Sequence, residues 1–449
     1  MPPANICMSI LIVGAGLGGL AAALALQADG HKVRILDAVS EFAEVSVYLW
    51  YGVGCIELPI NAQKQAGAGI RVPPNSTRLL RRWGVDLENM KKSVSRRYHF
   101  VRWQDGSTMV KIPFDSIEEK YGAPYYLVHR ADLHEALLTA VREAGVEVLN
   151  RQRVVSYDFQ EPSVTTQTGE VFTADLVIAA DGIKSITRPL LTGQPDVPRD
   201  TGDVAYRILL PAEKLLVDPE LASLITDPCT TSWCGPDAHI VGYPIRNGEL
   251  YNAVVCATSY NETTDEVWVI KGDNGELCKR FASWEPRVRK LFALTGDFMK
   301  WRLCDLPDLS RWVHPSGKVL LLGDSCHPML PYLAQGAAQA FEDAAALRQC
   351  LATTYVDLKD ALARYEAVRK PRVTLVQAKT REHQYILHID DGEEQELRDR
   401  RLQINGDENP IFWGCEERRE WLFGHDAEVL ESGGGNWRML PADADDAVT

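Results

Sequence analysis

A glycine-rich segment at residues 14–19 constrains the fold of this chain more than any other feature. Gly14, Gly16 and Gly19 follow an apolar run over residues 9–13 (S-I-L-I-V) and open an Ala/Leu-rich stretch over residues 17–27. The apolar run is typical of a parallel strand buried on both faces. Glycines at this spacing form a tight turn that lets a pyrophosphate approach the start of a helix. We therefore predict a strand, a glycine loop and a helix that bind a dinucleotide.

An acid continues this pattern. Residues 31–36 (H-K-V-R-I-L) predict a second strand that ends at Asp37, about 20 residues beyond the glycines, as in dinucleotide-binding folds. A carboxylate there can accept a hydrogen bond from the ribose 2′-hydroxyl and disfavours a 2′-phosphate. The competing interpretation is a glycine turn in some other α/β fold.

Two more strand-like runs end at an acid that adjoins a glycine. Residues 175–180 lead to Asp181, and residues 318–322 lead to Asp324. Ligands of open α/β sheets lie at the carboxyl ends of the strands, so both acids are expected near the glycine loop. Two such segments far apart in the chain indicate a long dinucleotide, which points to FAD. The alternative for Asp181 is an ordinary strand-end turn.

The remaining pattern predicts the domain organisation. Between residues 195 and 287, alternation predicts antiparallel strands over residues 203–210, 239–245, 250–257 and 266–270. Helices are expected over residues 76–83, over 132–143 with Asp132 as N-cap, and from 337 to about 385, followed by a frayed polar tail beyond Asp390.

The fold class is therefore mixed α/β (α+β). A Rossmann-like nucleotide-binding domain is expected in residues 1–194 and 288–350, with an inserted antiparallel-sheet substrate domain in residues 195–287. Residues 351–449 are expected to form C-terminal helices and a polar tail.

Charge and cysteine usage narrow the possible partners. The net charge of −14 argues against a nucleic-acid partner. The ten cysteines have no metal-ligand spacing, so we expect reduced thiols and no metal. Glycines interrupt the apolar stretch over residues 6–28, which disfavours stable membrane insertion. We expect a cytoplasmic protein, either monomer or homodimer.

Four motifs in order carry a family resemblance: the glycine fingerprint, His129-Arg130, Asp181-Gly182, and residues 323–337 (G-D-S-C-H-P-M-L-P-Y-L-A-Q-G-A). Together they resemble the single-component, class A flavoprotein aromatic hydroxylases, and most closely the salicylate hydroxylase-like branch common in fungi. The resemblance extends over nearly the whole chain, including Trp413 and residues 421–427.

This resemblance implies an FAD-dependent monooxygenase. NADH or NADPH would reduce the flavin, O₂ would add at flavin C4a, and the hydroperoxide would hydroxylate a small aromatic substrate. That substrate would be a phenol, a salicylate-like acid or a polyketide-derived ring, as in secondary metabolism. Competing interpretations are a flavin epoxidase, oxidase or dehydrogenase on the same scaffold, or an inactive flavoprotein-like protein.

The resemblance also implies the cofactor-binding residues. The ADP half of FAD would contact Gly14, Gly16, Gly19 and Asp37. Arg130 would contact the cofactor from the next layer, Asp181 would serve FAD and NAD(P)H, and Asp324 would bind the ribityl or phosphate region. The isoalloxazine ring would lie against Pro331, Gly336 and Ala337, and His327 would be a structural neighbour of this loop. A simple ion pair at a helix start is the alternative for Arg130.

Substrate-binding groups are expected in the antiparallel sheet. Arg207 could pair with a carboxylate or phenolate, and strand alternation places His239 and Tyr243 on one face. These three are the candidate catalytic residues. The alternatives are a structural ion pair for Arg207 and an ordinary sheet residue for His239.

One segment departs from the family pattern. Residues 46–66 interrupt it with aromatic and apolar sequence, and removing them restores a continuous family-like sequence. Our hypothesis is a retained intron translated in frame, or a late insertion. The alternative is a real loop that folds over the adenosine side of FAD.

Overall fold

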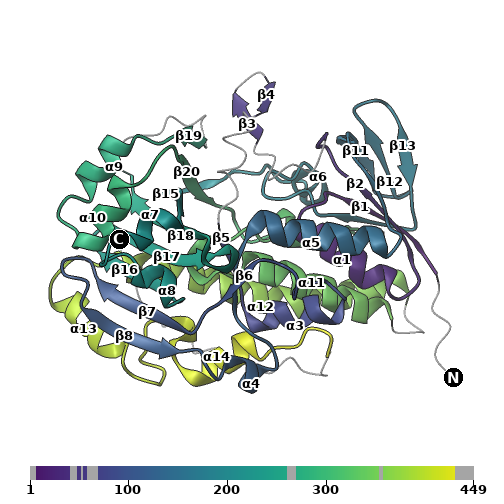
Figure 1. Ribbon diagram of the computed structural model, residues 1–449. Helices are drawn as coiled ribbons and strands as arrows, with labels where there is room; N and C mark the ends of the chain where they lie inside the picture. The colour runs from purple at the N-terminus through teal and green to yellow at the C-terminus, as the bar shows by residue number, and fades with distance from the viewer. Residues whose placement is uncertain are drawn as a thin grey trace, which may run out of the picture.

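The structure is a computed structural model, which describes residues 7–40, 48–51, 54–57, 69–259, 269–352 and 357–429. Its two main sheets lie at opposite ends of the molecule in Figure 1, and the long helices α11 (Gly336–Leu351) and α12 (Leu358–Leu387) run between them. The predicted mixed α/β class is confirmed.

The first sheet is fully parallel. Its strand order is β10 (Glu147–Leu149), β2 (Lys32–Leu36), β1 (Ser9–Val13), β14 (Leu176–Ala179) and β21 (Val319–Leu321). Helices α1 (Leu17–Gln27), α5 (Arg130–Glu143) and α11 contribute to the core on one face. Strands β11 (Val154–Asp158), β12 (Ser163–Thr166) and β13 (Val171–Thr173) pack on the other. Coverage on both faces explains why β1, β14 and β21 are almost entirely apolar. Towards the sheet edge, β2 and β10 carry the exposed residues Lys32, Arg34 and Glu147.

The second sheet has the strand order β19 (Val269–Lys271), β20 (Met299–Asp305), β15 (Arg199–Pro211), β18 (Leu250–Thr258), β17 (Ala238–Ile245), β16 (Thr230–Gly235), β7 (Arg97–Arg102) and β8 (Thr108–Pro113). All neighbours are antiparallel except β16 and β7. The strands predicted at 203–210, 239–245 and 250–257 are confirmed. Most of the strand predicted at 266–270 lies outside the described residues. Strands β7, β8 and β20 extend this sheet beyond residues 195–287.

Each face of this sheet has its own partner. One face packs on the short helices α7 (Ala212–Leu216), α8 (Ser223–Thr226), α9 (Asn274–Arg280) and α10 (Pro286–Ala293). The opposite face shares a core with Tyr332 and Leu333, from the loop that precedes α11, and with α12. The second face therefore meets the nucleotide-binding part of the chain.

A small antiparallel sheet joins the two halves. Its order is β5 (Gly69–Val72), β9 (Tyr126–His129) and β6 (Lys92–Val94). In the chain, α3 (Pro74–Arg82) follows β5 and α4 (Ile117–Tyr121) precedes β9. Strands β3 (Tyr48–Tyr51) and β4 (Gly54–Glu57) form a separate hairpin. The rest of the segment at 46–66 lies outside the described residues, and both interpretations of it stay predictions.

The C-terminal region is folded further than we expected. Helices α13 (Glu393–Arg401) and α14 (Glu416–Phe423) follow α12. The prediction of a frayed tail beyond Asp390 is wrong up to residue 429, because Phe412, Trp413 and Phe423 are buried in the core under the second sheet. Residues 430–449 lie outside the described part of the chain.

The predicted N-cap of α5 is also wrong. The helix begins at Arg130, and the Nδ1 atom of His129 accepts the hydrogen bond from the Ala131 N–H at 3.3 Å. Asp132 lies in the first turn instead, where its carboxylate accepts two hydrogen bonds from Arg246 at 2.6 and 2.8 Å. A histidine ring nitrogen thus replaces the expected carboxylate, while the acid still favours the helix start electrostatically.

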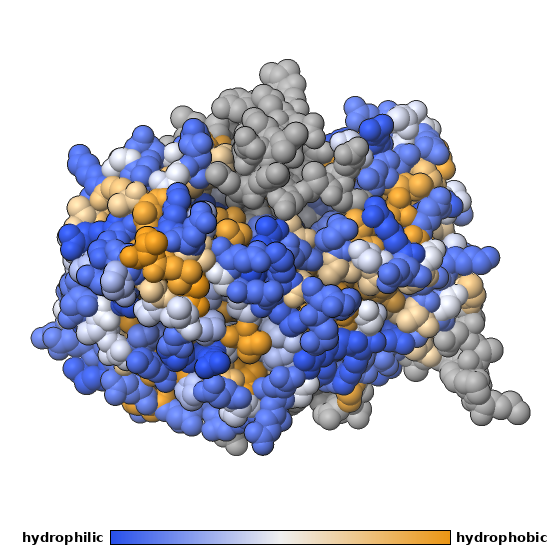
Figure 2. All heavy atoms as spheres, viewed as in Figure 1, coloured by the Kyte–Doolittle hydropathy of each residue, from blue (hydrophilic) through white to orange (hydrophobic). Residues whose placement is uncertain are grey.

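The face drawn in Figure 2 is mostly hydrophilic, with apolar residues in small separate groups. Among the described residues, no helix combines the length and apolar character needed to cross a membrane.

A buried histidine on α12 should make the free energy of unfolding depend on pH. His383 on α12 is 2% exposed; its Nδ1 lies 2.6 Å from the Lys379 carbonyl oxygen, and its Nε2 accepts from the Phe412 N–H at 3.0 Å. Burial lowers its pKa from 6.5 to about 4. The unfolded chain therefore binds the proton first as the pH falls, and stability is lost below about pH 6.5.

From this group alone we expect a loss of about 2 kcal/mol in unfolding free energy between pH 7 and pH 5. Urea unfolding of the wild type and His383→Gln at both values measures it. The variant should lose about 2 kcal/mol less than the wild type, and equal losses would contradict this assignment.

Candidate active site

The carboxyl ends of four parallel strands meet at one edge of the first sheet. The loop after β1 and Asp37 after β2 are joined directly, because the Ala15 N–H donates to Asp37 Oδ2 at 2.6 Å. Asp181 follows β14 and Asp324 follows β21, the next strands along the sheet. The structure therefore brings these predicted residues to one place, where ligands of open α/β sheets lie.

The three fingerprint glycines have different roles. A Cβ added at Gly14 would lie 2.3 Å from the Ala180 carbonyl oxygen, and one at Gly19 would lie 2.0 Å from the Gly14 carbonyl oxygen. These two positions pack backbone against backbone. Gly16 is different, because a Cβ added there meets nothing within 4 Å. Gly16 is the N-cap of α1, so the open space lies where a helix presents its free N–H groups to a phosphate.

Asp181 has a structural task at this edge. Its Oδ2 atom accepts hydrogen bonds from the Ile186 and Thr187 N–H groups and from the Thr187 hydroxyl, at 2.9 to 3.3 Å. It thereby stabilises the start of α6 (Thr187–Thr192). Burial raises the pKa of its carboxyl group. These bonds support the interpretation as a strand-end turn; the cofactor role of Asp181 stays a prediction.

Arg188, beside this turn, connects it to the segment around Asp324. Its buried guanidinium donates to the carbonyl oxygens of Asp324 and Ser325 at 2.8 and 2.7 Å, and to the Asp196 carboxylate at 2.5 Å. The backbone around Asp324 is therefore held in place, while the Asp324 side chain remains exposed.

Arg130, the first residue of α5, is a half-buried cation near Asp324. Partial burial lowers the pKa of its guanidinium, and the charge of Asp324 opposes that shift. Within the described residues its guanidinium forms no ion pair and no hydrogen bond. The alternative of a simple ion pair at the helix start therefore has no partner there, and the cation is available to an anionic ligand.

The predicted flavin loop lies before α11. Residues 331–333 form a single 3-10 turn, Ala334 adopts a left-handed conformation with φ of +53°, and Gly336 begins α11. Pro331 is exposed, and Gly336 and Ala337 are half-buried. The first N–H groups of this 16-residue helix have no acceptor within the helix, so they can donate to a ligand.

A buried ionic network holds α11 in place. Glu342 accepts hydrogen bonds from Arg369 at 2.7 Å, from Arg372 at 2.7 and 2.9 Å, and from the Asn75 side-chain amide at 2.7 Å. Both guanidinium groups hold the pKa of Glu342 well below its usual value despite complete burial. Asp343 accepts from Arg369 at 2.8 Å.

His327 belongs to the same network. Its Nε2 lies 2.5 Å from Asp343 Oδ2 on α11, so the ring is paired with a buried carboxylate that the sequence analysis did not predict. Ligand atoms of Cys326, His327 and Asp343 lie within 4.8 Å of one another. Arg369 and the Gly323 N–H already bind this carboxylate, and burial raises the pKa of the Cys326 thiol. We therefore assign the group to the ionic network.

The three predicted substrate residues lie on one face of the second sheet. Along β17, Tyr243 and His239 alternate with residues that pack against helices α7 to α10 on the other face of the sheet. Tyr243 belongs to the core that contains Tyr332 and Leu333. Arg207 lies two strands from β17, between Ala205 and Leu209 of the same face. Its guanidinium lies 4.9 Å from the centre of the Trp301 ring. Burial and the charge of Arg130 lower the pKa of Arg207.

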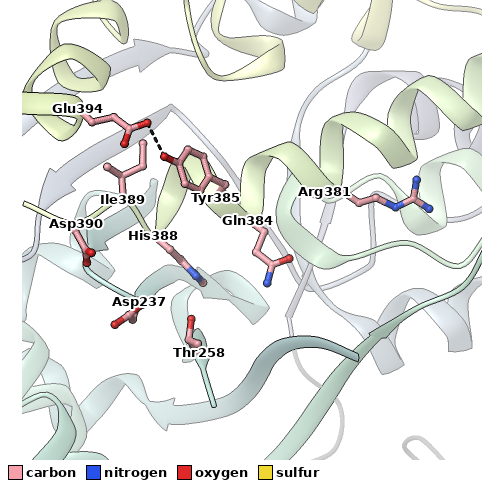
Figure 3. A pocket seen from close by; sticks show the side chains of 9 residues that line it. All are labelled: Asp237, Thr258, Arg381, Gln384, Tyr385, His388, Ile389, Asp390 and Glu394. Atoms are coloured by element: carbon pink, nitrogen blue, oxygen red, sulfur yellow. Dashed lines mark hydrogen bonds between the residues drawn. The ribbon is translucent and has the colours of Figure 1, made fainter. Parts of the chain in front are cut away.

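His239 forms a pair with another histidine. Its Nδ1 lies 2.8 Å from Nε2 of His388, and its ring centre lies 5.4 Å from that of Tyr332. His388 also lines a cavity of about 410 Å³ at the end of α12, where it points towards Thr258 (Figure 3). This cavity is separate from the edge of the first sheet. Burial holds the pKa of His239 well below its usual value, so the ring is neutral.

The sequence analysis missed one part of this face. Four side chains near Tyr243 come from different elements: Arg71 from β5, Tyr98 from β7, Tyr125 from just before β9, and Asn252 from β18. Alternation in residues 97–102 and 250–257 could have indicated which side chains share a face. Nothing in the local sequence indicates that β5 lies against β17 and β18.

Comparison with known proteins identifies the family. The chain is 36% identical over 446 residues to the FAD-dependent monooxygenase OpS4 of Beauveria bassiana (strain ARSEF 2860), covering 96% of this chain and 98% of the relative. The chain belongs to the FAD-dependent monooxygenases. The chain of the present structure is also 35% identical over 399 residues to 3-amino-4-hydroxybenzoate 2-monooxygenase PtmB3 of Streptomyces platensis. That match covers 88% of this chain and 92% of PtmB3.

Two family models and a solved structure agree with this assignment. Residues 308–380 of the monooxygenase match an FAD binding domain, and residues 12–43 match an NAD(P)-binding Rossmann-like domain. A salicylate hydroxylase in complex with its substrate has the same fold, with a TM-score of 0.72 at 24% identity, covering 94% of this chain and 96% of the other. The predicted salicylate hydroxylase-like fold is confirmed.

The site residues of this FAD-dependent monooxygenase fit FAD. Open space at Gly16 and the start of α1 suit the pyrophosphate. Arg130 offers a cation without a carboxylate partner among the described residues, and the start of α11 offers amide donors for the negative charge on a reduced flavin ring.

Proposed function

We propose that this FAD-dependent monooxygenase uses NADH or NADPH and O₂ to hydroxylate an aromatic ring. Bound FAD supplies electron transfer and oxygen activation. The observation that carries the proposal is the position of Arg207. It is a partly buried guanidinium without a carboxylate partner in the described residues, on the sheet face that packs against the loop at 331–337.

Arg207 and Tyr243 would bind the reacting hydroxyl group. A cation beside a phenol favours the phenolate, which activates the ring towards an electrophile. Burial raises the pKa of Tyr243, so its hydroxyl group stays protonated and can donate a hydrogen bond. His239 would act through Tyr332, whose hydroxyl donates to Asp203 Oδ2 at 2.6 Å, and would therefore position the loop beside the flavin.

The apolar surroundings would exclude water. Ala205, Val241 and Leu333 are buried around the polar groups of this face. Exclusion of water protects a reactive oxidant and strengthens the electrostatic effect of Arg207. The names of the relatives support an aromatic substrate, since PtmB3 acts on 3-amino-4-hydroxybenzoate.

Arg207→Gln is the variant that tests this function. We expect kcat/KM for NAD(P)H oxidation stimulated by the best phenol in a panel to fall about 30- to 100-fold, as for loss of a charged hydrogen bond. Arg207→Lys should restore part of the rate, and the rate at saturating substrate should become more dependent on pH, because phenol ionisation then limits it.

The matched control is Arg199→Gln on the same strand. Arg199 is largely exposed and pairs with Asp305 at 3.1 Å, so its loss should leave kcat/KM unchanged. A full rate in Arg207→Gln, or no stimulation of the wild type by any phenol or salicylate, would contradict the proposal.

A further inference from the structure

A second guanidinium lies on the substrate side of the sheet. Arg71 on β5 is 8% exposed, and its Nη1 donates to the Tyr98 hydroxyl at 3.3 Å. Its guanidinium also lies 5.6 Å from the centre of the Tyr98 ring. Tyr125 and Tyr243 also act on it electrostatically. Among the described residues, no carboxylate forms an ion pair with Arg71.

The three phenols do not neutralise this cation. Burial raises the pKa of Tyr125 to about 12 and also raises those of Tyr98 and Tyr243. All three are therefore neutral hydrogen-bonding groups at neutral pH. A buried charge without a counter-ion is strongly disfavoured, so a cation in these surroundings fits a site completed by an anion.

The backbone directs Arg71 towards the substrate face. Gly69 and Arg71 are two residues apart on β5, so their side-chain positions lie on the same side of the strand. A Cβ added at Gly69 would lie 2.7 Å from Tyr243 Cε2 and 2.8 Å from Asn252 Cγ. Figure 1 shows β5 beside β17 and β18, in agreement with these contacts.

Asn252 supplies a second donor without an acceptor. Its Oδ1 accepts the Gly69 N–H at 2.7 Å, which fixes the orientation of the amide group, because a backbone N–H needs an oxygen opposite it. The Nδ2 group is then buried, with no hydrogen-bond partner in the part of the chain that is described. Arg71 and Asn252 together offer several N–H donors, whereas their neighbours offer few acceptors.

We propose that Arg71 and Asn252 form an anion subsite that binds a carboxylate on the substrate, separate from the hydroxyl group that Arg207 binds. A guanidinium fork matches a carboxylate with two parallel hydrogen bonds. Both guanidinium groups act electrostatically on Tyr243. The preferred substrate is therefore a hydroxylated aromatic carboxylic acid. This inference rests on the proposed function.

The test compares an acid with its neutral ester on the FAD-loaded enzyme. The probes are 2,4-dihydroxybenzoate and its methyl ester, and binding is followed by the difference spectrum of the flavin. We expect the wild type to bind the acid about 30-fold more tightly, the effect of one charge-assisted pair. Arg71→Met should reduce the ratio of the ester and acid dissociation constants to near 1, and Arg71→Lys should give an intermediate ratio.

A thermal measurement separates binding from folding. Removing an unpaired buried cation should keep or raise the melting temperature of ligand-free Arg71→Met. The acid should raise the melting temperature of the wild type and of the control Arg199→Gln, but not that of Arg71→Met. Equal binding of acid and ester by the wild type, or an unchanged ratio in Arg71→Met, would overturn the subsite.

Failure of the subsite differs from failure of the function. If both probes stimulate NAD(P)H oxidation equally, in the wild type and in Arg71→Met, the proposed function is retained and the proposed subsite is wrong. If Arg71→Met retains the acid preference while Arg207→Gln loses it, the carboxylate is bound by Arg207 and the subsite is also wrong.

Discussion

Glu342→Ala is expected to destabilise the protein by about 3–5 kcal/mol, the usual consequence of removing one partner from a buried ionic network. The substitution leaves Arg372 without its carboxylate and Arg369 with Asp343 alone, both in buried surroundings. Because Glu342 lies on α11, the same change should loosen the start of that helix and weaken FAD binding. Urea unfolding of the apo-protein measures the first effect, and flavin retention the second.

Glu147→Ala is the matched control. Glu147 also pairs with an arginine, Arg34, at 2.6 Å, but both side chains are about half exposed. Its removal should change the unfolding free energy by no more than about 1 kcal/mol. A loss of stability in Glu342→Ala as small as in this control would show that the buried network is not what stabilises α11.

The second large effect separates two glycines of one loop. Gly14→Ala is expected to cost about 3 kcal/mol or more, because φ is +106° there and the new Cβ would overlap the Ala180 carbonyl oxygen. Gly16→Ala should change apo-protein stability by less than about 1 kcal/mol, since its backbone is extended and its surroundings are open. The same Cβ would occupy the space for the pyrophosphate, so FAD affinity should fall at least about tenfold.

Unfolding of the apo-proteins and titration with FAD test both statements together. Gly16→Ala should fold with near wild-type stability and lose flavin, whereas Gly14→Ala should show the large loss of unfolding free energy. Wild-type FAD affinity in Gly16→Ala would show that the phosphates do not lie at this loop, and it would contradict the placement of the cofactor.

The nucleotide-binding half could be predicted from sequence because its signals are local. A buried parallel strand reads as a continuous apolar run, and the glycines and Asp37 follow at fixed offsets. The predicted strand at residues 9–13 and helix at 17–27 agree with the structure residue for residue. The acids at the ends of β14 and β21 were also found correctly, because the carboxyl ends of parallel strands lie at one edge.

The face of the second sheet around Tyr243 was predicted only in part, because its contacts join segments far apart in the chain. Alternation within β17 placed His239 and Tyr243 on one face, and the structure confirms this. The approach of Arg71 to Tyr243 depends on how β5 packs against a strand about 170 residues later, which no spacing encodes. The ionic network of Glu342 was missed for the same reason: its partners come from α3, α11 and α12.

The most direct test of the central claim is mass spectrometry of the product formed by the FAD-loaded enzyme under ¹⁸O₂, with NAD(P)H and a hydroxylated aromatic acid. We predict a product that contains one more oxygen atom than the substrate, with that atom labelled. A dehydrogenated product without the label, or consumption of NAD(P)H with no change in the aromatic compound for every probe tested, would contradict assignment as an aromatic hydroxylase.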